Sequence, residues 1–476
     1  MLDMQLPALV SGLGLVNASC PATLAHADSL KTLLYLDPGT GSLLFSVIVG
    51  IASTAYFVGK DLLYRASARV RMLLSPQSGA TVRDAQRVEH AVVFYSEGKQ
   101  YQTTFGPLLQ QMQHREMPCL YLSSDPDDPL LALIQDGNNP LLRAEYIGNG
   151  HMAWARLMTL RARLVCMTTP GLDVLQIRRS PHVRHYMHIV HSPTDKAFNR
   201  PYSFDFFDSV LINGPHQERV IRTLENLRSR KTKDLFSVGC VYYDSLVSKY
   251  AAACERASAS RVAASNCSLR VLLAPTWGKN GLLSRFGSQL IKSIADAGLE
   301  VIVRPHPQSA RSEAELLSRL QKETVSLSNC RWDSSADPVD AMAASDILVS
   351  DISGIVFDYA FLTGRPVLTL DFTVDKRGFE AMDLPFEPWE IVCLEVIGRQ
   401  IKLEDIATIK AIIDEEVTSK DRAARIQQLR ETYVLNFGCA SEAAVELMAQ
   451  LAERGEQRQH GIEAAHHAGP AQPRRP

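Results

Sequence analysis

Short apolar runs alternate with amphipathic stretches along most of the chain after residue 88. The runs are rich in β-branched and aromatic side chains and end at glycine or polar residues, as buried strands do. They lie at residues 91–95, 119–122, 164–167, 188–190 and 206–212, and again at 271–273, 299–303, 347–349 and 367–370. Helical patterns follow several of them, at 104–113, 217–228 and 286–297. This repeated strand–turn–helix order predicts parallel sheets covered by helices.

The clearest strand–turn–helix–strand unit begins with the run at 347–349. It leads through Asp351 to Ser353, which is expected to cap a helix that ends at Gly364. A loop of this kind feeds a helix N-terminus, where free N–H groups and the helix dipole favour a phosphate. Ser353 and Gly354 therefore mark a candidate anion site. An ordinary strand–helix–strand unit with a good N-cap would give the same pattern.

A stretch rich in alanine and serine at 251–268 divides the pattern into two halves. Large apolar residues are scarce there, which suits a helix end and a connection between domains. We predict an α/β fold with two Rossmann-like domains that face a cleft, preceded by one N-terminal transmembrane helix. The predicted parts are a segment with signal-like features at 1–37, the transmembrane helix at 38–59, a basic juxtamembrane linker at 60–87, the first domain at 88–250, the linker at 251–268, the second domain at 269–452 and a disordered tail at 453–476.

The uncharged stretch at 38–59 is long enough to cross a hydrocarbon core of about 30 Å as a helix. Four basic residues follow it closely, whereas Lys31 is the only lysine or arginine before it. The positive-inside rule then predicts a single-pass protein of the cell inner membrane, with its catalytic domains in the cytoplasm. The glycine, serine and threonine content of the stretch also suits a shallow or re-entrant helix. Upstream, residues 6–16 and 25–27 have the form of a signal peptide without a basic start, so cleavage stays open.

The composition is that of a globular protein, since 46% of the residues are hydrophobic. A net charge of −2 from 50 basic and 52 acidic residues argues against nucleic acid as a partner, because nucleic-acid binding needs a concentrated positive field. The nine cysteines are scattered singly and predict reduced thiols, not disulfides or a zinc site. The pattern contains no cluster of metal ligands and no cofactor motif, so we expect neither a metal nor a cofactor.

Two histidines stand where an open α/β sheet gathers its functional loops. His191 directly follows the run at 188–190 and is able to take a proton from a hydroxyl at neutral pH. A histidine bonded to the loop backbone explains its position as well. His306 lies between two prolines that stiffen its loop, beside Arg304, and this pair suits a diphosphate or simply a rigid turn.

Further polar and aromatic residues follow other strands. Thr276 and Trp277 come after the run at 271–273, and Trp277 would stack on a base or, as the sequence favours, fill a gap between the domains. Gly98 and Lys99 form a polar turn after the first strand, and we count them among the candidate substrate contacts.

Several short motifs, each weak alone, occur in an order that resembles the CDP-glycerol glycerophosphotransferases, the teichoic acid primases and polymerases of the two-domain GT-B fold. The motifs are His191-Ser192-Pro193-Thr194, Gly239 with Asp244, the Ala-Pro-Thr-Trp of 274–277, His306-Pro307 and the Asp-Ile-Ser-Gly of 351–354. The resemblance covers roughly residues 88–451. It implies that His191 deprotonates the acceptor hydroxyl, and that His306 and the Ser353 region bind the donor diphosphate while CMP leaves.

The chain also departs from the family pattern. Ser192 stands for the glycine after the first histidine, and Gly354 stands for a second serine. The usual Pro-Arg-Asn-Asp is Val-Tyr-Tyr-Asp at 241–244, which drops an arginine and leaves the identity of the donor or acceptor open. The predicted transmembrane helix is not part of the family core.

The prediction is a membrane-anchored transferase that moves a glycerol-phosphate-like group from a CDP-linked donor to a polyprenyl-linked or glycan acceptor in cell-envelope polymer synthesis. The predicted catalytic residues are His191, His306 and Asp351, and the predicted substrate-binding residues are Arg304, Ser353, Gly354, Thr276, Trp277, Asp244, Gly98 and Lys99. Asp351 and Asp244 would orient loops. The alternatives are a nucleotide-sugar glycosyltransferase or epimerase of the same fold, and a non-catalytic scaffold of an envelope-polymer assembly.

Overall fold

The computed structural model describes residues 89–467, apart from residues 138, 265–267, 336, 352 and 371–373. At 260–264 and 454–467 it describes the backbone alone. The predicted segments at 1–37, 38–59 and 60–87 lie outside the described residues. In the part of the chain that is described, no helix combines the length and the apolar character that crossing a membrane requires.

The first sheet belongs to the N-terminal half and, within the described residues, has seven parallel strands in the order β3-β2-β1-β4-β5-β6-β7. The strands are β1 (His90–Ser96), β2 (Cys119–Ser123), β3 (Leu142–Tyr146), β4 (Ala162–Met167), β5 (Val183–Ile189), β6 (Ser209–Ile212) and β7 (Asp234–Ser237). The register pairs Val92 with Cys119 on one side and with Leu164 on the other. The chain therefore starts in the middle of the sheet and fills first one side and then the other, as doubly wound folds do.

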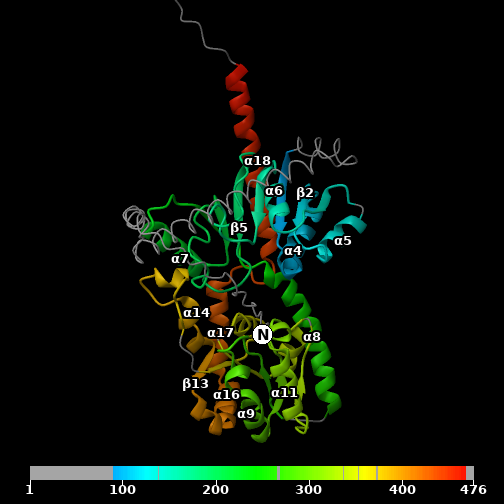
Figure 1. Cartoon of the computed structure of the whole chain (residues 1–476), viewed down its shortest axis with the longest axis vertical. Helices are drawn as coiled ribbons and strands as arrows, with labels where there is room; N and C mark the ends of the chain where they lie inside the picture. The colour runs from blue at the N-terminus through cyan, green and yellow to red at the C-terminus, as the bar shows by residue number, and fades with distance from the viewer. Residues whose placement is uncertain are drawn as a thin grey trace, which may run out of the picture. The chain divides into compact units, whose positions relative to one another are not determined.

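Helices cover both faces of this sheet (Figure 1). They are η1 (Lys99–Tyr101), α4 (Gln102–His114), α5 (Pro129–Asp136), α6 (His151–Met158) and α7 (Pro215–Leu227). Phe105 and Leu108 of α4 bury one face, together with Phe94 of β1. Leu157 of α6 packs on the opposite face with Val93. Alternate residues of β1 thus enter two separate cores, because successive side chains of a strand point to opposite faces.

The second sheet has six parallel strands among the described residues, in the order β10-β9-β8-β11-β12-β13. They are β8 (Arg270–Leu273), β9 (Glu300–Val303), β10 (Cys330–Trp332), β11 (Ile347–Ser350), β12 (Val367–Leu370) and β13 (Gly398–Ile401). The accompanying helices are α9 (Leu282–Asp296), α10 (Ser309–Ser312), α11 (Ala314–Thr324), α12 (Val339–Ala344), α13 (Ile355–Thr363), η2 (Glu380–Met382), α14 (Trp389–Val392), α15 (Leu394–Ile397), η3 (Leu403–Thr408), α16 (Ile409–Thr418) and α17 (Lys420–Tyr433). The predicted α/β class with two parallel sheets is confirmed.

Two helices connect the halves. α8 (Tyr242–Ala264) carries Tyr243 and Ala253 into the core of the second half, so that much of the stretch expected to be a linker is helical. α18 (Ala440–His467) returns to the first half (Figure 1). Ala444 and Met448 pack there in the same core as α4. The predicted boundaries differ here, since 440–452 were assigned to the second domain and 453–467 to a disordered tail.

The loop before α14 forms a further contact between the halves. Ala381 and Leu384 of the second half pack against Val220 and Leu224 of α7. Beside this apolar contact, the guanidinium of Arg228 forms ion pairs with Asp205, Glu380 and Asp383. Residues from both halves are therefore joined by apolar and by charged contacts.

Candidate active site

The His191 loop begins where β5 ends. The ring of His191 packs edge-on against the ring of Tyr101, with 5.0 Å between the centroids and an angle of 78°. Tyr101 ends η1, the short helix that follows Gly98 after β1. The structure thus brings the predicted Gly98–Lys99 turn to the neighbourhood of His191, because β1 and β5 both flank β4 and end at the same edge of the sheet.

Side chains from the β6–α7 connection hold the backbone of this loop. Asn213 Nδ2 donates to the Ser192 carbonyl at 2.6 Å, and Gln217 Nε2 donates to the Thr194 carbonyl at 2.7 Å. His216 Nε2 donates to the Pro193 carbonyl at 2.7 Å. Three consecutive carbonyls therefore have fixed partners, and the position of His191 does not depend on a flexible loop.

Burial, helped by the nearby charge of Lys196, lowers the pKa of His191 to about 3. The ring is therefore neutral at neutral pH and able to accept a proton. Its Nδ1 atom is buried, and no described group meets it in hydrogen-bonding geometry, although the Ile189 backbone lies near enough to favour the protonated form slightly. The contact with the Ile189 backbone fits the alternative of a histidine bonded to the loop backbone, and the neutral ring fits a base.

Charged residues of the His191 loop meet residues of the second half. Asp195 Oδ2 accepts from the Trp389 backbone N–H at 2.7 Å, and Lys196 Nζ donates to Ser192 Oγ at 2.6 Å. Burial and the neighbouring charge of Asp195 raise the pKa of the Glu390 carboxyl to about 8. Asp195, Lys196, Trp389 and Glu390 were not among the sequence candidates. The charged pair at 195–196, directly after the motif at 191–194, was the signal for two of them.

Glu390 is expected to make the stability of the protein depend on pH above neutrality. Its pKa is about 4.5 when unfolded and is raised to about 8 in the folded protein. Its contribution to stability is therefore full below about pH 4.5 and is lost as the pH rises through about 8. We expect unfolding free energy to fall by on the order of 1 kcal/mol between pH 7 and pH 9. Urea unfolding at both pH values measures this difference, and Glu390→Gln should remove it. An equal difference in the variant would assign the effect to another group.

In the second sheet, Asp351 lies at the end of β11 and is 5% exposed. Its carboxylate accepts from the Thr276 backbone N–H at 2.7 Å and from the Leu282 N–H at 3.2 Å. Burial raises its pKa to about 6. Both oxygens are thus engaged with the β8–α9 loop, which fits the expected role of orienting a loop. Thr276 is held in place through its backbone.

Trp277 and His306 lie near each other at the ends of β8 and β9. Their ring centroids are 6.5 Å apart and the planes differ by 35°. Trp277 is 47% exposed, so the prediction that it fills a gap between the domains is wrong, and its ring is available for stacking. His306 Nδ1 accepts from the Gln308 N–H at 3.1 Å, so the neutral ring carries its proton on Nε2. Burial lowers the pKa of His306 and keeps this neutral form.

Arg304 is placed differently from the expectation. Its guanidinium donates to Asp333 Oδ2 at 2.5 Å and to Ser335 Oγ at 3.0 Å, and the residue is 6% exposed. A guanidinium engaged in a buried ion pair is a weak candidate for a diphosphate, since binding would have to displace Asp333. The structure therefore assigns Arg304 to the β9–β10 edge of the sheet.

The start of α13 also differs from the expectation. Gly354 precedes the helix without a side-chain capping bond, and the Ser353 carbonyl accepts from the Val356 N–H. The predicted Ser353 side-chain cap is wrong. A Cβ atom added at Gly354 would meet no atom within 4 Å, so the space in front of the helix is open. No side chain caps this end of the helix, so the positive end of its dipole is open to an anion, as the predicted anion site requires.

Asp244 is engaged in the framework. Its two carboxylate oxygens accept from the Ala440 N–H at 2.9 Å and from the Ser441 N–H at 2.7 Å, and so cap the N-terminus of α18. The hydroxyls of Tyr242 and Tyr243 donate to Asp358 of α13 at 3.2 Å and 2.9 Å. The Val-Tyr-Tyr-Asp segment, which departs from the family pattern, thus joins α8 to α13 and α18.

Gly239, in the same motif as Asp244, is required by close packing. Its φ is +96°, and a Cβ atom there would lie 2.0 Å from the Leu435 carbonyl oxygen. Gly239 packs against the segment before α18, and Asp244 caps that helix. These structural contacts explain both residues without a ligand.

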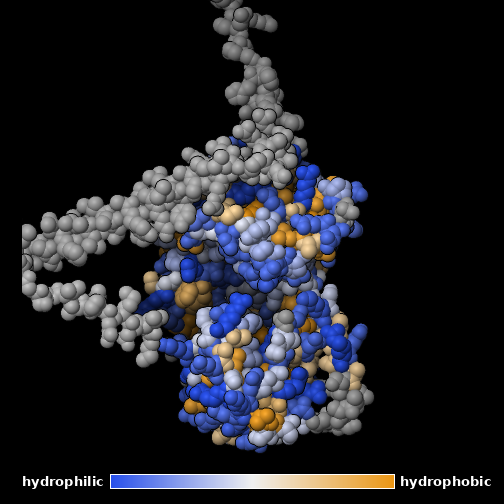
Figure 2. Space-filling model, turned by 45° about the vertical axis from the view of Figure 1, so that its right-hand side comes forward, coloured by the Kyte–Doolittle hydropathy of each residue, from blue (hydrophilic) through white to orange (hydrophobic). Residues whose placement is uncertain are grey.

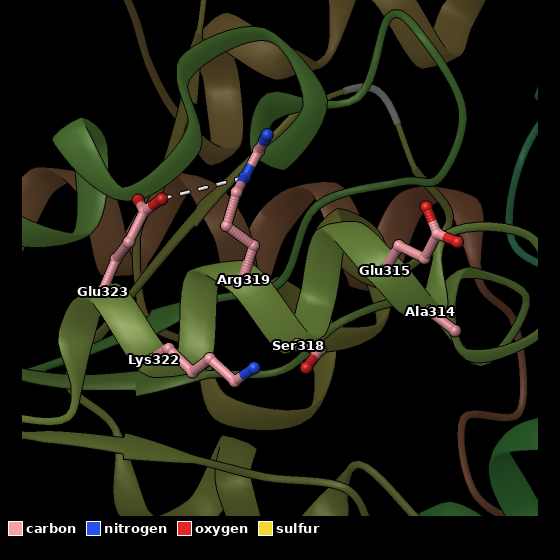
Figure 3. A pocket seen from close by; sticks show the side chains of 6 residues that line it. All are labelled: Ala314, Glu315, Ser318, Arg319, Lys322 and Glu323. Carbon is pink, nitrogen blue, oxygen red and sulfur yellow. Dashed lines mark ion pairs between the residues drawn. The ribbon is translucent and has the colours of Figure 1, made fainter.

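Figure 2 shows a hollow about halfway along one face, with mainly hydrophilic residues around it. A separate hollow follows α11, where Arg319 and Glu323 form an ion pair of 3.8 Å (Figure 3). All of its lining side chains come from this one helix, so it does not enclose a ligand. None of the sequence candidates lies in it.

The candidate residues thus form two groups. His191 joins Gly98 and Lys99 at the carboxyl edge of the first sheet. Thr276, Trp277, His306 and Asp351 gather at the carboxyl edge of the second, next in sequence to Ser353 and Gly354. Arg304 and Asp244 are held apart by their own partners. Among the described residues, no group of three or more His, Cys, Asp or Glu side chains has the arrangement of a metal site.

Comparisons with known proteins agree with this geometry. The family described as CDP-Glycerol:Poly(glycerophosphate) glycerophosphotransferase matches residues 85–389. The wall teichoic acid polymerase TagF superposes with a TM-score of 0.51 at 16% identity, covering 82% of this chain and 98% of that chain. A histidine-to-alanine variant of TagF gives a TM-score of 0.50 at 15% identity, with 84% and 98% covered. A comparison with curated protein sequences finds no match. At these identities the superpositions show the fold.

Proposed function

Since the chain belongs to the CDP-glycerol:poly(glycerophosphate) glycerophosphotransferase family and is a transferase of GT-B fold, we propose that it moves a glycerol-phosphate-like group from a CDP-linked donor to the hydroxyl of a polyprenyl-linked or glycan acceptor. The observation that carries this proposal is His191, a neutral and fixed imidazole at the carboxyl edge of the first sheet. The family is one of transferases, so its match favours an enzyme over the alternative of a non-catalytic scaffold.

The proposed reaction is an in-line displacement at phosphorus. His191 takes the proton of the acceptor hydroxyl, and the acceptor oxygen forms a bond to the phosphorus that carries the glycerol. The bond from this phosphorus to the CMP oxygen breaks, and CMP leaves with the electron pair. The imidazolium that forms next to the phosphates is stabilised by their negative charge, which compensates for the low pKa of His191.

The donor is proposed to lie at the edge of the second sheet. The Nε2–H of His306 and the positive end of the α13 dipole would face the diphosphate and stabilise the charge that develops on CMP. Trp277, exposed beside His306, suits stacking on the cytosine ring. Asp351 fixes the loop that carries Trp277 through the Thr276 N–H.

CMP release from CDP-glycerol tests the proposal directly. We expect the detergent-solubilised full chain, supplied with membrane lipid extract, to release CMP, and CDP-glycerol to protect it from thermal unfolding better than UDP-sugars do. Release and protection with UDP-sugars but not with CDP-glycerol would instead select the nucleotide-sugar glycosyltransferase or epimerase alternative.

Charge stabilisation is proposed to come from histidine, helix dipole and basic side chains. On this mechanism the rate of CMP release is expected to stay within about twofold in excess EDTA, because these groups are part of the chain. The measurement is CMP release before and after EDTA treatment, with added Mg²⁺ as the control. Loss of release in EDTA, restored by Mg²⁺, would contradict this part of the mechanism.

The membrane location is proposed from the sequence at 38–59, outside the described residues. Removal of residues 1–69 is expected to release the protein from sedimenting membranes, because the uncharged stretch supplies the apolar anchor. Fractionation of cells that express the full chain and the shortened chain measures this. A shortened protein that still sediments would place the membrane contact on the catalytic domains.

A further inference from the structure

Buried polar atoms without partners gather at the carboxyl edge of the first sheet. Among the described residues, six such side-chain atoms belong to the ends of β4 to β6 and the start of α7. They are Thr168 Oγ1, Thr169 Oγ1, His188 Nδ1, His191 Nδ1, Asn213 Oδ1 and His216 Nδ1. Buried polar groups normally have partners, so a concentration of unpaired ones marks a place that a polar ligand or water occupies.

Lys196 brings a positive charge to this place. Its Nζ donates to Ser192 Oγ at 2.6 Å, and no carboxylate of the described residues lies within 4.0 Å of it. The closest acidic neighbour in sequence, Asp195, uses both oxygens on the backbone N–H groups of Ala197 and Trp389. Two of the three ammonium protons are thus left for other acceptors.

A second lysine of the same half shows the usual arrangement. Lys233, 3% exposed at its side chain, pairs with Glu225 Oε1 at 2.6 Å. A partly buried ammonium without a carboxylate in contact lowers stability. Burial lowers the pKa of Lys196, and the more distant charges of Glu390 and Asp195 act in the opposite direction. A cost of this kind is typical of a residue that binds an anion supplied by a ligand.

The backbone of Lys196 is also held in an unfavourable conformation. Its backbone φ is +67°, a left-handed value that residues other than glycine and asparagine rarely adopt. The neighbouring carbonyls of the loop are fixed by Asn213, His216 and Gln217. The loop thus holds the lysine at the side of His191, whose pKa its charge lowers.

We propose that Lys196 is a phosphate-binding residue, and that its ammonium group contacts an anionic phosphate oxygen of the substrate whose hydroxyl or phosphorus reacts at His191. The positive charge of Lys196 lowers the pKa of both His188 and His191, so the three basic side chains lie near one another. Ser192 Oγ and Thr194 Oγ1 supply further hydrogen bonds. The inference rests on the proposed function and deepens it: the anion is either a phosphate at the end of the acceptor or the transferred phosphoryl group of the donor.

The test uses the full-length protein, the variant Lys196→Met and the control Lys233→Met. Glycerol 3-phosphate is titrated as the acceptor-end probe and CDP-glycerol as the donor probe, both followed by the shift of the melting temperature. Loss of one charge-assisted hydrogen bond should weaken binding about tenfold or more. Weaker binding of glycerol 3-phosphate alone assigns the acceptor phosphate, and weaker binding of CDP-glycerol alone assigns the donor. Unchanged binding of both overturns the proposal.

Stability gives an independent readout. Lys196→Met should keep or raise the melting temperature without ligand, since it removes an ammonium that lacks a carboxylate partner. Lys233→Met should lower it, because the buried Glu225 then loses one of its two cation partners and keeps Arg222. A loss of stability in Lys196→Met as large as in Lys233→Met, with unchanged ligand binding, would show a structural lysine. If Lys196→Met does not fold, Lys196→Gln keeps a donor for Ser192 and provides the same binding test.

The binding test separates this inference from the proposed function. Glycerol 3-phosphate binding that depends on Lys196, without CMP release from any donor, would retain the phosphate site and reject the glycerophosphotransferase proposal. CMP release that is equal in the native chain and in Lys196→Met would retain the transferase proposal and reject Lys196 as the phosphate contact.

Discussion

Replacement of His191 by glutamine is expected to lower the rate of CMP release by about 10²–10⁴. The neutral imidazole is the group that takes the proton of the acceptor hydroxyl, and an amide of similar size keeps the packing on Tyr101 without this basicity. The KM for CDP-glycerol should change little, since the donor is proposed to bind at the second sheet. Initial rates at saturating donor, with the melting temperature as a folding check, measure the effect.

The matched control is His114→Gln, at the exposed end of α4. It should release CMP at the native rate, because it removes a histidine far in sequence from the candidate loops. A native rate in His191→Gln would keep the donor assignment and discard His191 as the base. A rise in the donor KM with an unchanged maximal rate would move His191 to donor binding.

Replacement of Arg228 by methionine is expected to lower the free energy of unfolding by about 3–5 kcal/mol. The Arg228 guanidinium pairs with Asp205 at 3.0 Å and with Glu380, whose side chains are 8% and 3% exposed. Its removal leaves the nearly buried Glu380 without its cation and leaves Asp205 with Arg230. Urea unfolding followed by circular dichroism measures the loss.

Arg256→Met is the control, since Arg256 pairs with Asp340 at the surface, where both side chains are more than 60% exposed. This variant should lose less than about 1 kcal/mol. Adding Asp205→Asn and Glu380→Gln to Arg228→Met should restore part of the stability, because the buried charges are then removed as well. Equal losses in Arg228→Met and Arg256→Met would show that solvent screens the Arg228 network.

The sequence by itself determined the class of the fold and the interior of both sheets. Each strand that the apolar runs predicted is an inner strand, for example β1, β11 and β12. The strands that the runs missed are β3, β7, β10 and β13, the edges of the two sheets. An inner strand of a parallel sheet is buried on both faces and reads as a continuous apolar run. An edge strand such as Asp234–Ser237 is partly exposed and lacks this signal.

The sequence also indicated the loops that carry the candidate site. His191 and His306 follow inner strands. The order of the motifs indicated the family whose model matches residues 85–389. The polarity of a residue in such a loop did not show what it contacts. Arg304 and Asp244 had residue types that suit substrate binding. In the structure Arg304 instead pairs with Asp333, and Asp244 accepts hydrogen bonds from the start of α18.

Only the tertiary structure decided which charges have partners. Lys196 and Lys233 look alike in the sequence, but Glu225 reaches Lys233 from α7, whereas Asp195 is drawn to the backbone of Trp389. Partners of this kind come from segments far apart in the chain, so local pattern does not reveal them. Apolar periodicity depends on burial, which neighbours in sequence share, and the pairing of charges depends on packing between elements.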